Sequence, residues 1–232
     1  MLDALRRRIP RAVAALVLIF VAQVTAAAAL YPGGTWLHRQ RIGHDLWGNF
    51  VCDLTQPVAL NGRPNALGAR FGAAALLTFT VALTLVWQHF AALLQGPAAR
   101  RGRFIAAAGT LGCAALVAVP CTPSLRFGRV HAAVVLTAVA ASLAALGAAT
   151  VALLRHLPPD TSTAPRRTLA RALSVALVLA VLIDAGLYAY SLAPGGRIVP
   201  LLPALQRVAT ALSLGWMLAV VSLRPVSPRA AG

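Results

Sequence analysis

Long apolar stretches separated by short polar connections dominate the pattern of hydrophobic and polar positions in this chain. Six of the stretches are long enough to cross a bilayer as helices, judged from their length and their charged flanks. The pattern predicts an all-α fold, a polytopic bundle of six transmembrane helices that forms one integral membrane domain over residues 1–232. The expected spans are residues 12–30, 69–94, 104–120, 129–154, 169–192 and 200–223.

The connections between these spans are mostly short, so consecutive helices are expected to be antiparallel neighbours. The exception is the stretch of residues 31–69 between the first two spans, which holds most of the polar variety of the chain. Tyr31, Trp36 and Trp47 in this stretch are residue types that suit the headgroup layer of a membrane.

Part of this long segment, the sequence GHDLWGNFVCDL at residues 43–54, is consistent with a short helix. In such a helix Asp45, Asn49 and Asp53 would follow one another at intervals of four residues and share one face. The turn-like NGRPN sequence at residues 61–65 would end the segment before the second span.

The charged residues are unusual in kind: the 21 basic residues are all arginine and the five acidic residues are all aspartate. Without lysine or glutamate the chain cannot form a retinal or pyridoxal Schiff base, an HExxH zinc helix or a Walker phosphate loop. These classes of site are therefore excluded.

The arginines lie in clusters at the ends of the spans rather than along one soluble face, so the net charge of +16 does not predict nucleic-acid binding. Under the positive-inside rule they place both termini in the cytoplasm and residues 31–69 outside. We interpret the first apolar stretch as a retained span rather than a cleaved signal, because five spans would put the C-terminal arginines outside. The predicted location is the inner (plasma) membrane, as a multi-pass protein. The clusters that support this orientation are Arg6 to Arg8 with Arg11, Arg100 to Arg103, Arg155 with Arg166, Arg167 and Arg171, and Arg224 with Arg229.

Two opposite charges fall inside the last two spans. Asp184 lies before the outer end of the fifth span and Arg207 lies at a similar depth in the sixth. We therefore predict a buried ion pair between Asp184 and Arg207, because either charge alone would be costly in hydrocarbon. The pair could be structural or part of a site.

Three further polar residues are expected in the same outer half of the protein. Asp53 and His131 are candidate catalytic residues, with His131 as general base or acid and Asp53 orienting it, and Asn49 is a candidate ligand-binding residue. The alternatives are a helix-capping role for Asp53 and Asn49 and an interfacial His131 bonded to a carbonyl group.

The three cysteines fall into two groups by their position relative to the predicted spans. Cys52 and Cys121 fall in predicted outer loops, where an oxidising compartment would allow a disulfide between them, and we prefer this to a catalytic thiol at Cys52. Cys113 lies inside the third span. The histidines are not paired at one depth as a bis-histidine haem site requires, and no dense metal cluster is apparent, so neither a cofactor nor a metal is expected.

Four short motifs recur in an order typical of one superfamily. They are NFVCDL (Asn49 to Leu54), RPNAL (Arg63 to Leu67), VAVPCTP (Val117 to Pro123) followed by His131, and ALQRV (Ala204 to Val208). In this order the chain resembles the DRAM-type superfamily of six-span membrane proteins. That superfamily includes GPI-anchor lipid-remodelling proteins, autophagy modulators and a prokaryotic branch of unknown function. The prokaryotic branch often has Ser before the Asp and Glu before the last Arg, where this chain has Cys52 and Gln206.

The resemblance implies an outer-leaflet pocket that involves Asp53, His131 and Arg207, in a family whose better-known members act on or near lipids. We therefore expect a protein that binds or processes a lipid or lipid-linked headgroup, with Arg207 engaging an anionic group and Asp184 holding the guanidinium. Whether it is an enzyme stays open, because no nucleophile is evident.

Two other functions fit the same sequence. One is a small proton-coupled transporter in which Asp184 titrates. The other is a non-catalytic scaffold whose Ala- and Gly-rich helix faces bind a partner membrane protein or a second copy of the chain. The expected partners are thus membrane lipids, with a homo-oligomer or partner protein as the alternative.

Overall fold

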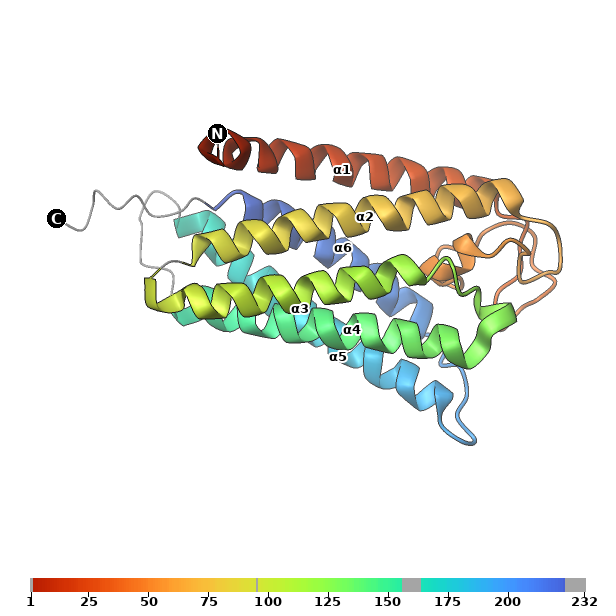
Figure 1. Ribbon diagram of the computed structural model, residues 1–232. Coiled ribbons are helices and arrows are strands. Elements are labelled where there is room, and N and C mark those ends of the chain that lie inside the picture. The colour runs from red at the N-terminus through yellow and green to blue at the C-terminus, as the bar shows by residue number, and fades with distance from the viewer. Residues whose placement is uncertain (1, 95, 156–163, 224–232) are drawn as a thin grey trace.

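The computed structural model describes residues 2–94, 96–155 and 164–223, and these residues form an all-helical structure. Figure 1 shows the long helices running roughly side by side, with the connection between α1 and α2 gathered at one end. The beginning of α1 and the end of α6 lie at the opposite end. The long helices are α1 (Leu2–Leu30), α2 (Ala66–Leu93), α3 (Ala99–Ala118), α4 (Ser124–Arg155), α5 (Ala164–Leu192) and α6 (Leu202–Val221), and two short 3₁₀ helices are η1 (Val51–Thr55) and η2 (Gly96–Ala98).

The expected spans coincide with these helices, and several helices begin before the apolar stretch does. Ser124 begins α4 and Ala164 begins α5, each five residues ahead of the span predicted from hydropathy. Helix geometry continues through these polar turns because backbone hydrogen bonds do not depend on the apolar boundary. Residues 156–163 and 224–232, which hold most of the fourth connection and the C-terminal arginines, lie outside the described residues.

Five of the helices are long and apolar enough to cross a membrane: α2, α4, α5, α6 and the Arg8–Leu30 part of α1. Helix α3 is not among them, since Arg100, Arg101 and Arg103 occupy its first two turns. It nevertheless packs within the bundle, against both α2 and α4.

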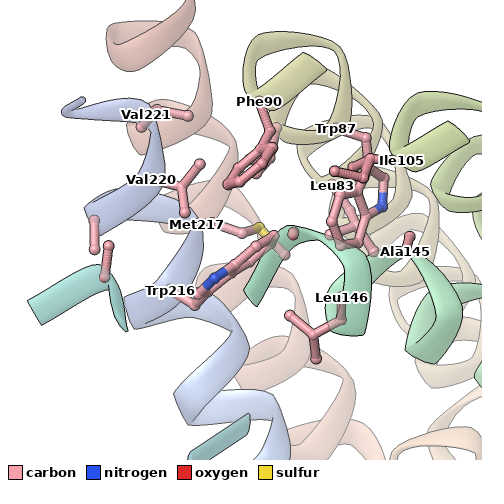
Figure 2. Packing of buried hydrophobic residues seen from close by; sticks show 14 of the residues in the cluster. Leu83, Trp87, Phe90, Ile105, Ala145, Leu146, Trp216, Met217, Val220 and Val221 are labelled. Carbon is pink, nitrogen blue, oxygen red and sulfur yellow. The ribbon is translucent and has the colours of Figure 1, made fainter. Parts of the chain in front are cut away.

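The core lies toward the end of the bundle where α1 begins, and it joins α2, α3, α4 and α6. Trp87 and Trp216 contact each other at its centre, with ring centroids 5.0 Å apart (Figure 2). Helix α3 approaches Trp87 closely at Gly109, where a Cβ atom would overlap the indole ring. Without a hydrophobic driving force between helices in lipid, such close contacts between small and large side chains supply much of the packing energy.

At the other end of the bundle, a glycine sets the position of the long connection. Gly72 of α2 lies against the Leu54 carbonyl group of η1, and a Cβ atom there would overlap that carbonyl. The 3₁₀ helix therefore rests directly on the backbone of α2. This contact places the residues around η1 against the ends of α2 and α6.

Candidate functional site

Residues 31–65, which we call the cap segment, fold over one end of the bundle. Two isolated β-bridges, Gly33 with Ile42 and Val58 with Pro64, close two turns in it. Gly33 and Gly34 have positive φ angles and lie against the backbone of neighbouring turns, so a larger residue does not fit at either position. Tyr31, expected in the headgroup layer, is instead buried, and its hydroxyl group accepts a hydrogen bond from Leu60 N at 3.1 Å.

The buried carboxylate of Asp53 is the centre of this segment. It accepts hydrogen bonds from Trp36 Nε1 at 3.1 Å, Asn49 Nδ2 at 3.1 Å and the Phe50 backbone N at 2.9 Å. Burial raises the pKa of Asp53 to about 6, while these hydrogen bonds and the charge of Arg207 oppose the rise. Asp53 is therefore largely ionised at neutral pH and holds three parts of the segment together.

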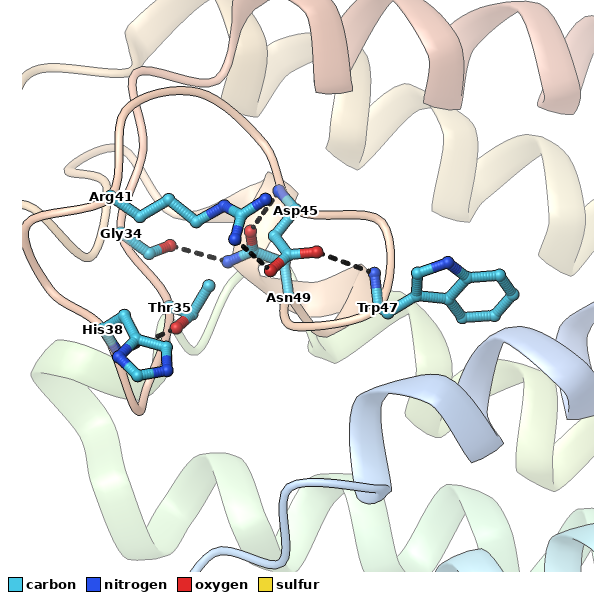
Figure 3. A network of polar contacts seen from close by, with 7 residues as sticks. All are labelled: Gly34, Thr35, His38, Arg41, Asp45, Trp47 and Asn49. Carbon is cyan, nitrogen blue, oxygen red and sulfur yellow. Dashed lines mark hydrogen bonds and ion pairs between the residues drawn. The ribbon is translucent and has the colours of Figure 1, made fainter.

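Asn49 connects Asp53 to the rest of the segment. Its Nδ2 also donates to the Gly34 carbonyl at 2.8 Å, and its Oδ1 accepts from the Asp45 backbone N at 2.9 Å. Figure 3 shows this network together with the ion pair between Arg41 and Asp45, whose N–O distance is 3.0 Å. Asp45, Asn49 and Asp53 thus lie together as their spacing predicted, although turns and the short η1 take the place of the expected helix.

Two neighbouring residues of α6 attach the cap segment to the bundle. Gln206 Oε1 accepts from the Val51 backbone N at 2.7 Å. Arg207 donates from Nε to the Leu46 carbonyl at 3.1 Å and from Nη2 to the Asn49 carbonyl at 3.0 Å. These bonds join the last helix to the first connection of the chain.

The third contact of Arg207 is with a histidine. Arg207 Nη2 lies 3.2 Å from His44 Nε2, and because a guanidinium group only donates, His44 accepts through an unprotonated Nε2. Burial, followed by the charge of Arg207, lowers the pKa of His44 to about 4. All three groups that hold Arg207 are therefore neutral.

The predicted ion pair between Asp184 and Arg207 is wrong. Within the residues that the structure describes, Arg207 forms no salt bridge, and its bonds go to the cap segment instead of α5. Asp184 is half-buried on α5, and in the same described part of the chain it makes no hydrogen bond or ion pair. Similar depth on adjacent helices does not fix the direction in which a long side chain extends.

The predicted pairing of His131 with Asp53 is also absent. His131 is buried on α4 just beyond a kink at Gly128, and its Nδ1 lies 2.6 Å from the Thr122 carbonyl. The carbonyl accepts a hydrogen bond from Nδ1–H, so Nε2 is the unprotonated nitrogen of the neutral ring. Thr122, in the connection before α4, therefore orients this ring in place of Asp53.

The structure also lacks the disulfide expected between Cys52 and Cys121, because both thiols are free. Cys121 is exposed, and its Sγ lies 3.9 Å from the Val117 carbonyl of the preceding helical turn. Burial raises the pKa of the Cys52 thiol, Asp53 and Asp184 raise it further, and Arg207 lowers it. A thiol with a raised pKa is a poor nucleophile, which agrees with the preference against a catalytic Cys52.

Several residues of the site were assigned no role in it from the sequence. Trp36, His44 and Gln206 contact Asp53, Arg207 and Val51 respectively. Gln56 was missed as well; its Nε2 donates to Ser124 Oγ at 2.9 Å and ties the cap segment to the start of α4. Gln206, a polar residue within the apolar span of α6, carried the clearest available signal. No group of three or more metal-ligating side chains occurs among the described residues.

No family model, curated protein or solved structure matches this chain.

The shifted pKa values of Asp53 and His44 predict opposite effects of pH on stability. The pKa of Asp53 is about 6 in the folded protein, against 3.8 for the free residue, so the protonated carboxyl group favours the folded state. This contribution to stability is complete below pH 3.8 and is lost as the pH rises through 6. The pKa of His44 is about 4 in the folded protein, against 6.5 for the free residue, so the neutral imidazole favours the folded state. This contribution to stability is complete above pH 6.5 and is lost as the pH falls through 4. The two effects cancel in the wild type between about pH 4 and 6.

Single substitutions should expose each effect when unfolding in detergent is followed across that window. Relative to the wild type, Asp53→Asn should lose stability as pH falls. His44→Gln should gain stability as pH falls, at up to about 1.4 kcal/mol per pH unit for one proton. Equal slopes in the two variants would contradict this assignment.

Proposed function

We propose that this chain is a six-span membrane protein that binds the anionic headgroup of a lipid or lipid-linked molecule at Arg207. The observation that carries the proposal is the state of that guanidinium group. It is half-buried near the start of α6 and is held by a histidine nitrogen and two carbonyl groups, none of which carries a negative charge. Its positive charge is therefore fixed in position without a direct ion pair among the described residues, and the nearby carboxylate of Asp53 acts on it without contacting it.

The free donors of Arg207 support the same proposal. Among the described residues, Nε and Nη2 have protein partners, whereas Nη1 has none. A guanidinium group with one edge anchored and one edge free suits a phosphate or carboxylate, because its donors match the spacing of two oxygens.

Exposed apolar side chains on the cap segment support a ligand from the membrane. Leu37, Ile42, Leu46 and Trp47 are all exposed, with Ile42 at 82% and Trp47 at 58%. Trp47 directly follows Leu46, whose carbonyl binds Arg207. Aromatic and aliphatic side chains of this kind insert into the interfacial layer of a bilayer. In the proposed arrangement they hold the cap segment where lipid headgroups reach Arg207.

The proposed topology places the cap segment outside the cell and both termini in the cytoplasm. The arginine-rich starts of α3 and α5 lie at the end of the bundle opposite the cap segment (Figure 1), which accords with the positive-inside rule. In this topology α3 also crosses the membrane, which gives six spans in total.

Cys121 allows this topology to be tested with a native residue. It is the exposed cysteine and lies at the cap-segment end of the bundle, between α3 and α4. A membrane-impermeant maleimide added to intact cells from which any outer membrane has been removed should label the wild type, and Cys121→Ser should lose most of the label. Labelling that appears only after the membrane is permeabilised would reverse the proposed orientation.

Lipid retention tests the function itself. In native mass spectrometry from a non-ionic detergent, the wild type should retain a phospholipid, and Arg207→Gln should lose at least about tenfold in occupancy, equivalent to about 1.4 kcal/mol. Arg70→Gln is the matched control, because Arg70 is an exposed arginine at the same end of the bundle.

Arg207→Lys separates ligand binding from folding, because lysine keeps the positive charge but cannot reproduce the three bonds to the cap segment. It should keep partial occupancy. Because the pKa of the half-buried Cys52 thiol is raised, slow reaction of Cys52 with thiol reagents is expected while the cap segment is folded, and this serves as the folding control in each variant. Equal lipid retention by Arg207→Gln and the wild type would refute the proposed site.

A further inference from the structure

Asp184 is a charged group for which the described structure provides no partner. It lies within α5, eight residues before the end of that helix, and is half-buried. The ion pair found among the described residues joins Arg41 and Asp45, and no hydrogen bond reaches Asp184 within those residues. An ionisable side chain inside a span costs several kcal/mol, on the order of 2.5 to 3.5 on insertion scales, and commonly marks a site.

Asp184 and Arg207 lie on neighbouring helices that contact each other, and both affect the same thiol. Cys52 of η1 lies close enough to both for Asp184 to raise the pKa of the thiol and for Arg207 to lower it. Opposite charges on the contacting helices α5 and α6 therefore both lie in the neighbourhood of Cys52. They remain apart because the contacts with Leu46, Asn49 and His44 direct the guanidinium group toward the cap segment.

This arrangement differs from an ordinary internal ion pair. A guanidinium group held by neutral acceptors keeps its attraction for an anion, and a carboxylate without a donor keeps its attraction for a cation. One ligand that carries both charges, with a short chain between them, can satisfy both groups at once.

We propose that the ligand bound at Arg207 is a zwitterionic phospholipid whose phosphate contacts Arg207 and whose primary ammonium group contacts Asp184. This inference rests on the proposed function and specifies its ligand class. A primary ammonium fits better than a quaternary one, because it donates hydrogen bonds to a carboxylate, whereas quaternary groups are bound mainly by aromatic faces. The acyl chains of such a lipid would lie along the apolar outer surface of α5, where Leu179, Leu182 and Ile183 are exposed.

The test compares phosphatidylethanolamine, phosphatidylcholine and phosphatidylglycerol with identical acyl chains, each added to delipidated protein in a non-ionic detergent. Native mass spectrometry of the wild type should show phosphatidylethanolamine retained at least about tenfold more than either other lipid, equivalent to about 1.4 kcal/mol. Water-soluble glycerophosphoethanolamine at the same concentration should not displace it, and displacement would overturn the assignment to a membrane lipid.

Variants then separate this inference from the proposed function. Asp184→Asn should reduce the preference for phosphatidylethanolamine over phosphatidylglycerol to less than about twofold while phosphatidylglycerol is still retained, and Asp184→Glu should keep the preference. Arg207→Gln should lose all three lipids, and Arg70→Gln should behave as the wild type.

Each failure has a distinct meaning. If Arg207→Gln loses lipid but Asp184→Asn keeps the wild-type preference, or if the wild type shows no preference, the zwitterionic ligand is wrong and the anionic site stands. If Arg207→Gln retains lipid as the wild type does, or if the wild type retains none, both proposals are wrong.

Discussion

The attachment of Arg207 to the cap segment is the interaction on which the cap-segment end of this molecule depends. One side chain near the start of α6 binds two carbonyl groups and a histidine from a segment about 160 residues earlier in the chain. Gln206, next to it, adds a further bond to the start of η1. Because the guanidinium group uses neutral acceptors, it fixes the segment without losing its charge. The same residue can therefore stabilise the fold and attract an anion.

The buried carboxylate of Asp53 is the second requirement, and it acts on the segment from within. An ionised group with no exposed surface is tolerated only where donors surround it, and Trp36, Asn49 and Phe50 supply them. These donors come from two stretches, one around Trp36 and one at residues 49–50, that lie outside the helices. Asp53 thus organises the segment, and Arg207 anchors the organised segment to the helices.

The helices could be predicted closely from the sequence, whereas the side-chain partners of the site could not. Hydropathy located the long helices, and five of them have the length and apolar composition that a bilayer core requires of a span, independently of what the helix packs against. Counting residues also placed Asp184 and Arg207 on adjacent helices at similar depth, but their pairing was wrong because depth does not specify where a long side chain extends. Asn49 and Asp53 were grouped correctly because turns and helices both bring residues four apart together. A carbonyl partner for His131 was the alternative that the sequence left open, but the identity of that carbonyl, Thr122, could not be predicted because a kink at Gly128 lies between the two residues.

We propose, centrally, that the two opposite charges near Cys52, Arg207 and Asp184, are completed by a ligand rather than by each other. A high-resolution structure determined in nanodiscs of native lipid tests it most directly. The account predicts headgroup density with phosphate oxygens within hydrogen-bond distance of Arg207 Nη1 and an ammonium group beside Asp184. A direct salt bridge between Arg207 and Asp184, with no headgroup between them, would contradict it.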